Sequence, residues 1–283
     1  MKLEANYHTH TALCGHAVKM SEDYIKEAIR QGFQEIGFSD HGPIPRYFMD
    51  NDTYLANNLD RQMSELDFVN IYLPDLDTSI NKYKDKIKIL KGLEIEYLPG
   101  NDNYYKFLLN KLDYLSLGVH FFPTNGEIYN TYETMNETQI MDYAYSVSDA
   151  LDTGFFSILN HPDLYLMNYS YEKPFLFDDA AKKAATIIIK SAIKNNVYLE
   201  INGGGTRKGK YEINNKKLYL YPRYDFWKVV ESYPKALIIF GCDTHNPKEL
   251  YDSIIEETLD FAELFSFHLS TKIDFENHKI KIK

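Results

Sequence analysis

Short apolar runs alternate along this chain with longer segments of helical periodicity, and this alternation limits the possible folds more than any other feature. The apolar runs predict strands at residues 3–7, 35–38, 87–95, 114–119, 155–159, 197–201 and 237–240. Helical periodicity predicts helices from Ser21 to Gly32 and near residues 59–85, 103–111, 137–153, 179–195, 223–233 and 247–266. Strands that alternate with helices form parallel sheets, because a parallel connection must cross over and a helix spans that distance.

The order of the elements favours an α/β fold, a distorted (β/α)7 barrel related to the TIM barrel, with residues 1–283 as a single domain. No Pro-, Gly- or Ser-rich linker divides the 283 residues. The alternative is an open doubly wound sheet, which binds ligands at one switch point, whereas a barrel gathers all strand ends on one face. Residues 271–283 alternate weakly and are expected to form a closing hairpin.

Charge and composition exclude several classes of function. The formal net charge of -10 disfavours binding to long nucleic acids, which requires rows of basic residues, but a metal ion would still attract a small anion. Cys14 and Cys242 stand in unrelated segments, which is typical of a protein from a reducing compartment. No apolar stretch approaches the roughly 20 residues that cross a bilayer. We therefore expect a cytoplasmic protein with no membrane partner.

Histidines and acids gather where the predicted strands end. All nine histidines except His268 and His278 lie at such positions. The set of strand-end residues is His8, His10 and His16 after the first strand, Asp40 and His41 after the second, Glu94 and Glu96 in the third, His120 after the fourth, His161 after the fifth, and Asp243 and His245 after the last. In a barrel these residues converge on one face.

Such a set is suited to metal binding. Side chains two residues apart in an extended segment point the same way, so His8 and His10 can hold one ion, and Asp243 and His245 repeat this spacing. A closed barrel brings the last strand beside the first. Imidazole with carboxylate suits zinc, manganese or iron better than magnesium or calcium. A single histidine at a strand end is usually structural, but this many at one face indicate a metal centre.

These motifs resemble those of the PHP superfamily, and in particular its histidinol-phosphate phosphatases. The resemblance extends from Tyr7-His8-Thr9-His10 through Ser39-Asp40-His41 and Gly92-Leu93-Glu94 to Asp243-Thr244-His245. It implies a metal-dependent phosphomonoesterase of histidine biosynthesis with two to three divalent ions and a small-molecule substrate. The implied ligands are His8, His10, Glu94 and Asp243 for the first ion, Glu94, His120 and His161 for the second, and His16, His41 and His245 for the third.

Two residue assignments stay open at this point. Glu94 and Glu96 share a face of their strand, and the resemblance favours Glu94 as the bridge between two ions. Asp40 is interpreted as a partner of the ligands or as a proton-transfer group.

The resemblance also implies a mechanism. Neighbouring ions lower the pKa of a bridging water, and the hydroxide would attack phosphorus in line. Either Asp40 or Asp243 is a candidate for the acid that protonates the leaving group.

Arg207 is the first candidate for binding the phosphoryl oxygens. It follows Gly203, Gly204 and Gly205 after the sixth predicted strand, and a guanidinium binds two phosphate oxygens at once. The alternative is an ordinary solvated loop. Arg46 and Arg223 are weaker candidates. The segments 43–58, 121–136 and 164–177 follow strands and are expected to overhang the site.

Three other functions compete with this hypothesis. A phosphoesterase of the same fold acting on nucleic-acid ends would need a basic groove, which the net charge of -10 disfavours, although small nucleotides remain open. An amidohydrolase barrel also begins with His-x-His, but the chain offers no convincing metal-bridging lysine. A non-catalytic metal-binding barrel would have lost several ligands. Histidinol phosphate as the substrate rests on the resemblance only, and the native metal and the oligomeric state are left open.

Overall fold

A ring of parallel strands forms the centre of the computed structural model, which describes residues 3–169, 176–213 and 215–278. The strands of the ring, in order, are β1 (Ala5–Asn6), β2 (Glu35–Phe38), β3 (Lys88–Lys91), β4 (Glu94–Ile95), β5 (Ser116–Leu117), β8 (Ile158–Leu159), β9 (Tyr198–Asn202) and β12 (Leu237–Gly241). Every pairing between neighbouring strands of the ring is parallel. The alternating pattern of the sequence therefore predicted the fold class correctly.

Two single bridges close the ring and account for its distortion. One sheet contains β1, β2 and β3, and the other runs from β4 through β12. His41 bridges to Glu94 on one side, and Thr9 bridges to Thr244 on the other. The predicted strand 87–95 is thus divided into β3 and β4. Between them, a Cβ on Gly92 would lie 2.3 Å from Cζ of Tyr114, so only glycine lets the backbone pass this ring.

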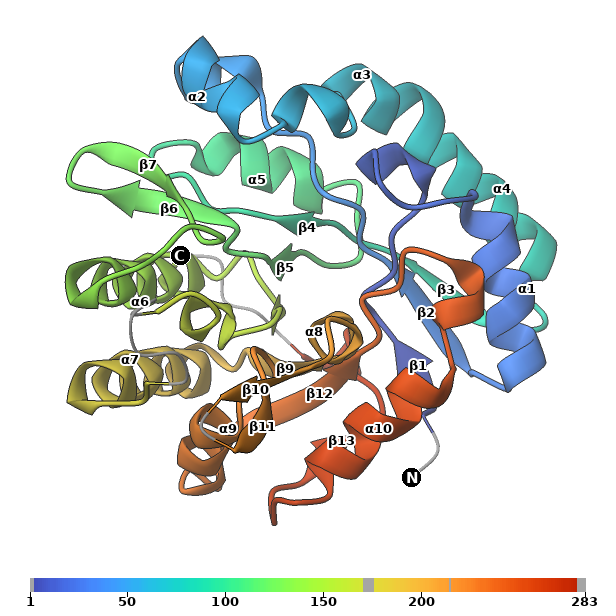
Figure 1. Ribbon diagram of the computed structural model, residues 1–283. Helices are drawn as coiled ribbons and strands as arrows, with labels where there is room; N and C mark the ends of the chain where they lie inside the picture. The colour runs from blue at the N-terminus through green and yellow to red at the C-terminus, as the bar shows by residue number, and fades with distance from the viewer. Residues whose placement is uncertain (1–2, 170–175, 214, 279–283) are drawn as a thin grey trace.

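Helices surround the ring, as Figure 1 shows. They are α1 (Ser21–Gln31), α4 (Leu73–Tyr83), α5 (Asp102–Leu109), α6 (Glu137–Asp152), α7 (Asp179–Asn195), α9 (Tyr224–Glu231) and α10 (Ser253–Ala262). The predicted helix 59–85 is instead a series: a 3-10 turn at Leu59–Arg61, α3 (Glu65–Asp67), a π-helical turn at Phe68–Tyr72, and α4. The predicted helix 247–266 is a 3-10 turn at Pro247–Glu249 followed by α10.

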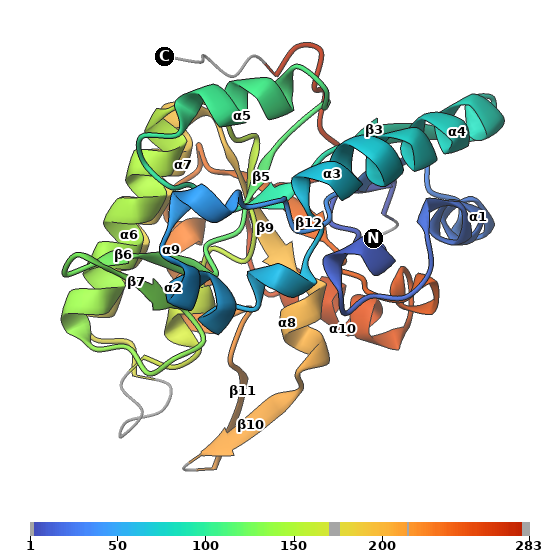
Figure 2. The same cartoon turned by 90° about the horizontal axis from the view of Figure 1, so that it is seen from above.

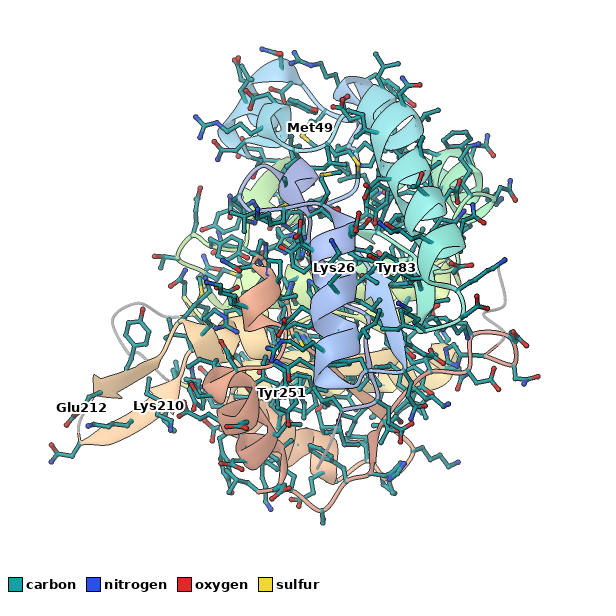
Figure 3. The ribbon with its side chains drawn as sticks, turned by 90° about the vertical axis from the view of Figure 1, so that its right-hand side faces the viewer. Lys26, Met49, Tyr83, Lys210, Glu212 and Tyr251 are labelled. Atoms are coloured by element: carbon teal, nitrogen blue, oxygen red, sulfur yellow. The ribbon has the colours of Figure 1, made fainter. Side chains whose placement is uncertain are left out.

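Polar contacts join the outer surfaces of α1 and α4. Figure 3 shows α1 and α4 side by side, with Lys26 and Tyr83 facing each other. Glu22 of α1 accepts hydrogen bonds from Lys82 at 2.8 Å and from Tyr83 at 2.9 Å, and it pairs with Lys26 at 2.7 Å. The opposite face of α1 buries Tyr24, Ile25 and Ala28 against the strands. This division follows from the helical spacing of the apolar residues.

The chain near residue 270 seals one end of the barrel. Short strand β13 (Leu269–Ser270) lies parallel to β12, and the Ile273 amide donates to the Tyr7 hydroxyl at 3.0 Å. Ile273 packs with Tyr7 and Tyr114 in the barrel interior. The expected hairpin is not formed by residues 271–278, because this segment packs into the barrel end instead, and 279–283 lie outside the described residues.

Two helices and two hairpins of the described residues were not predicted, nor were β13 and several 3-10 turns. The helices and hairpins are α2 (Asn51–Ala56), α8 (Gly203–Arg207), the hairpin of β6 (Phe121–Thr124) and β7 (Glu127–Asn130), and the hairpin of β10 (Lys210–Ile213) and β11 (Lys216–Tyr219). The second hairpin, which carries Lys210 and Glu212, projects from the body of the molecule (Figures 2 and 3). None of the helices among the described residues has the length and apolarity needed to cross a membrane.

Candidate metal centre

The carboxyl ends of the ring strands bring nine side chains to one place. These are His8, His10, His16, His41, Glu94, His120, His161, Asp243 and His245. Their ligand atoms form overlapping groups, in each of which all atoms lie within 4.8 Å of one another. Three of the groups are His8 with His10 and Asp243, Glu94 with His120 and His161, and His16 with His41 and His245. Two more join His10 to His41 and Glu94, and to Cys14 and His245. The first three match the ligand sets that the family resemblance implied, apart from the membership of Glu94 in the first.

Glu94 lies between the groups. Its Oε2 is 3.3 Å from Nε2 of His8 and 3.5 Å from Nε2 of His10. Its Oε1 is 2.9 Å from Nε2 of His161 and 3.5 Å from Nε2 of His120. Each carboxylate oxygen therefore faces a different group. This is the geometry of a bridging ligand, whereas Glu96 contacts only His120 within the cluster.

A second set of polar residues orients the cluster. Glu200 Oε2 lies 2.8 Å from Nδ1 of His8, and Glu96 Oε1 lies 2.8 Å from Nδ1 of His120. In both rings Nε2 is left to face the cluster. Asn160 Nδ2 donates to Glu94 at 3.0 Å. Sequence reasoning missed Glu200 and Asn160, although Glu200 was visible as a single charged residue within an apolar strand.

Burial and charge shape the electrostatics of the cluster. Burial alone would raise the pKa of Glu94, but the surrounding His8 and His120 hold it well below its usual range. Asp243 behaves in the same way beside His8 and His10. Burial lowers the pKa of His8, yet Glu200, Asp243 and Glu94 raise it well above the ordinary value. The acids are therefore ionised and attract a cation into their midst.

The backbone at the strand ends adopts unusual conformations. His161 and Asp243 have φ values of 32° and 47°, in the left-handed region that side chains other than glycine rarely adopt. Two glycines make room for the acids. A Cβ on Gly118 would lie 2.5 Å from Oε1 of Glu94, and one on Gly204 would lie 2.3 Å from Oδ2 of Asp243. Strain and close approach of this kind are frequent at functional sites.

The donor set fits divalent metal ions. Nε2 of His10 and Nε2 of His245 are buried and have no hydrogen-bond partner within the described ranges. Buried polar atoms are normally satisfied, so these nitrogens indicate a missing acceptor of their lone pairs. The exposure of the side chains increases across the cluster, from the buried His8 and Glu94 to the exposed His16. One side of the cluster is thus open to a small molecule.

Two adjoining cavities, of about 420 Å³ and about 360 Å³, open from the cluster and share His16, His41, His120 and Tyr132. The first, here called the amide lobe, is lined by Asn57, Asn58, Arg61, Gln62, Glu96 and Asn130. The second, here called the arginine lobe, is lined by Gly204, Arg207, Lys208, Tyr221 and Glu249. Segments 43–58 and 121–136 thus reach the site as expected. Part of the third expected segment, 170–175, lies outside the described residues.

The three arginines proposed for phosphate binding lie in different surroundings. Arg207 lines the arginine lobe on helix α8 and not on a loop, and its guanidinium forms a bidentate pair with Asp252 at 2.7 and 3.3 Å. Arg46 is exposed and stacks over Tyr54 at 5.1 Å, outside both lobes. Arg223 is buried at the start of α9, where its amide donates to Asp163. The geometry therefore favours Arg207 and gives no support to the other two.

Asp40 points away from both lobes. Its carboxylate accepts hydrogen bonds from the Thr11 amide at 2.6 Å and the Thr11 hydroxyl at 2.8 Å. Burial raises the pKa of this carboxyl to about 7. The contact holds the turn that follows His10. Asp40 therefore acts on the cluster through the backbone, and its place in the structure does not favour direct proton transfer to a substrate.

Comparison with known proteins gives matches along most of the chain. Residues 6–204 match the model of the PHP domain. A probable histidinol-phosphatase of Deinococcus radiodurans is 25% identical over 250 residues, which is 86% of each chain. A probable histidinol-phosphatase of Schizosaccharomyces pombe is 30% identical over 219 residues, 71% of this chain and 70% of the relative.

A solved structure has the same fold. It is a histidinol phosphate phosphatase of Lactococcus lactis in complex with zinc, L-histidinol and phosphate. The two structures superpose with a TM-score of 0.70 at 18% identity, and the match covers 96% of this chain and 98% of the other.

Proposed function

The chain belongs to the PHP domain family, and from this premise we propose that it is a metal-dependent phosphomonoesterase that hydrolyses L-histidinol phosphate to L-histidinol and phosphate. Residues 1–283 would act as a single barrel domain in the cytoplasm. The supporting observation is the position of Glu94 between two groups of histidines at the open end of the barrel. The names of the relatives from D. radiodurans and S. pombe support the substrate.

The proposed centre holds two to three divalent ions. His8, His10, Glu94 and Asp243 would hold the first, Glu94, His120 and His161 the second, and His16, His41 and His245 the third. Imidazole and carboxylate donors suit zinc, manganese or iron. Zinc in the Lactococcus lactis protein supports zinc among these three. Bound ions supply an activated water and neutralise charge on the phosphoryl group.

The residues of the chain orient the reaction. Glu200 and Glu96 hold His8 and His120 with Nε2 toward the centre, which spares the reorganisation of these rings during turnover. Arg207 would bind phosphoryl oxygens from the arginine lobe. Its guanidinium would then divide its hydrogen bonds between the phosphoryl group and Asp252. Asp243 is held ionised by its histidine neighbours, so it suits a ligand better than a proton donor.

The test is phosphate release by the metal-reconstituted protein from a panel of phosphomonoesters. The panel contains L-histidinol phosphate, nucleoside monophosphates and sugar phosphates. We expect kcat/KM for L-histidinol phosphate to exceed the others by about 100-fold, because a site with buried polar groups strongly rejects substrates that leave them unpaired. Similar slow rates on all compounds would overturn the assignment of the substrate. A preference for nucleotides would assign a nucleotide as the substrate instead.

A further inference from the structure

The amide lobe is built by two elements that the sequence did not predict. Asn57 and Asn58 follow α2, and Asn130 ends β7. Asn130 Nδ2 donates to Asn57 Oδ1 at 3.2 Å, so the two elements are joined across the lobe. The lobe begins at His16, His41 and His120 of the metal centre. It is therefore placed to receive the part of a substrate that extends away from the phosphoryl group.

Glu96 is the acidic residue of this lobe. It is 5% exposed and is the only carboxylate among the described lining residues. Its Oε1 contacts Nδ1 of His120, and no hydrogen bond to its Oε2 is found in the described part of the chain. A carboxylate has about four acceptor positions, and a buried one is stable only when donors occupy several of them. The second oxygen thus has capacity for a donor that enters the lobe.

The position of Glu96 limits the length of the ligand that it can bind. One imidazole ring separates it from the group of Glu94, His120 and His161, because Nδ1 of His120 faces Glu96 and Nε2 faces His161 at 3.3 Å. A cationic donor beside Glu96 would therefore lie only a few bonds from a phosphoryl group held at the metal centre. This spacing corresponds to an amine on the carbon chain next to the ester oxygen.

We propose that Glu96 binds the ammonium group of the substrate's alcohol portion, so that the amide lobe selects phosphomonoesters of short amino alcohols. The inference rests on the proposed function and adds a specificity-determining residue to it. The side chains of Asn57, Asn58, Gln62 and Asn130 offer neutral donors and acceptors for the rest of the alcohol. Arg61 also lines the lobe, but it is exposed, so water and salt screen its repulsion of an ammonium group.

The experiment compares two substrates that differ only in the amine. These are L-histidinol phosphate and 3-(imidazol-4-yl)propyl phosphate, which lacks the amino group. A hydrogen bond to a charged group contributes about 1.5–3 kcal/mol, so the wild-type protein should prefer the amine by about 10-fold to 100-fold in kcat/KM. Glu96→Gln keeps an acceptor for His120 but removes the charge. The preference should then fall to about threefold or less.

The matched control is Glu200→Gln. Glu200 holds His8 as Glu96 holds His120, at the same distance of 2.8 Å, but it lines neither lobe. Loss of activity through a misplaced ligand histidine affects both substrates equally. Glu200→Gln should therefore lower both values of kcat/KM and leave their ratio unchanged.

Two outcomes with these substrates would overturn the inference. If Glu96→Gln lowers both activities but keeps the ratio, Glu96 serves only to hold His120. If the wild-type protein hydrolyses both compounds equally well, the lobe does not recognise an amine, although the phosphatase assignment stands. If it hydrolyses neither, the proposed substrate is wrong, and the comparison is made with phosphoethanolamine and propyl phosphate. Equal rates on that pair would also overturn the inference. A preference for phosphoethanolamine that is lost in Glu96→Gln would support it.

Discussion

Pairs of carboxylate and imidazole determine how the histidines of this centre are held. Glu200 and Glu96 contact Nδ1 of His8 and His120, and Glu94 and Asp243 lie on the Nε2 side of His8. A ring held at one nitrogen presents the other in a defined direction, which lowers the entropy lost when a ligand binds. Function at this scale depends on acids outside the recognisable histidine motifs.

His120→Ala should remove one ligand of the second group. Because Glu94 and His161 alone offer too few donors for an ion at that position, we expect one equivalent less metal and a loss of at least about 100-fold in kcat. Elemental analysis and phosphate release measure the two effects. His278→Ala is the control, since His278 lies outside the cluster beside Asn196. Near-normal turnover of His120→Ala would rule out a multinuclear mechanism.

Asp40 should make stability depend on pH. Burial raises its pKa from 3.8 to about 7. Between these values the folded protein keeps a proton that the unfolded chain has released, so the stabilisation is complete below about pH 4 and is lost as pH rises to 7. Asp40→Asn lacks this titration. Its stability relative to the wild type should rise by on the order of 4 kcal/mol over that range.

Urea unfolding of both proteins in a chelator at several pH values tests this expectation. The hydrogen bond from the Thr11 amide remains possible in the variant, because the amide oxygen of asparagine accepts it. Other titrating groups cancel in the difference between the two proteins. A constant difference from pH 4 to 7 would show that Asp40 titrates as an ordinary exposed acid does.

At the scale of elements, helix α8 and helix α10 meet at the site through Arg207. The guanidinium pairs with Asp252, and Asp252 also caps α10 by accepting from the amides of Ile254 and Ile255. The side chains of Arg207 and Asp252 are 25% and 29% exposed, so the pair is largely shielded from water. The same contact holds the guanidinium at the edge of the arginine lobe.

Arg207→Ala should affect both the substrate and stability. Loss of a charged contact to phosphate should lower kcat/KM by about 10-fold to 100-fold, and loss of the largely buried bidentate pair should lower the free energy of unfolding by about 1–3 kcal/mol. Steady-state kinetics and urea unfolding provide the two values. Lys210→Ala is the control, because Lys210 is exposed on β10 and lines neither lobe. Unchanged kinetics for Arg207→Ala would restrict Arg207 to joining the two helices.

At the scale of the whole molecule, the metal centre joins the first and the last strand of the ring. Its residues extend from His8 after β1 to His245 after β12, where a single backbone bridge closes the ring. An ion bound there would add to the hydrogen bonds that join these segments, such as those from the His10 amide to the Thr244 carbonyl at 3.0 Å and from the Val18 amide to the His245 carbonyl at 2.9 Å. Metal binding should consequently stabilise the entire fold, since the unfolded chain cannot hold these residues in place.

Removal of metal should lower both stability and activity. Metal at about 100 times its Kd stabilises a protein by about 2.7 kcal/mol, which for a chain of this size corresponds to a Tm higher by roughly 5–10 °C. Thermal unfolding with a chelator, and after addition of zinc, manganese or iron, measures the shift. Magnesium is the control, because it prefers oxygen ligands. An unchanged Tm under all conditions would contradict a metal centre at these residues.

The sequence by itself determined the order of the ring strands and of the main helices around them, and the positions of the cluster residues. Apolar periodicity follows from which face of each element is buried, and strand-end residues of a parallel barrel must converge, so both features are readable locally. The candidate ligands from His8 to His245 can therefore be identified from the sequence.

Only the tertiary structure decided which residues surround that centre. Glu94 and Glu96 lie on the same face of their strand, and only their contacts show that Glu94 faces both groups of histidines. Arg207 lies on a helix, and its guanidinium pairs with Asp252. The packing of residues 271–278 into the barrel and the joining of Asn57 to Asn130 depend on partners far away in the chain. Such contacts carry no periodic signal, because they arise from the three-dimensional fit between elements.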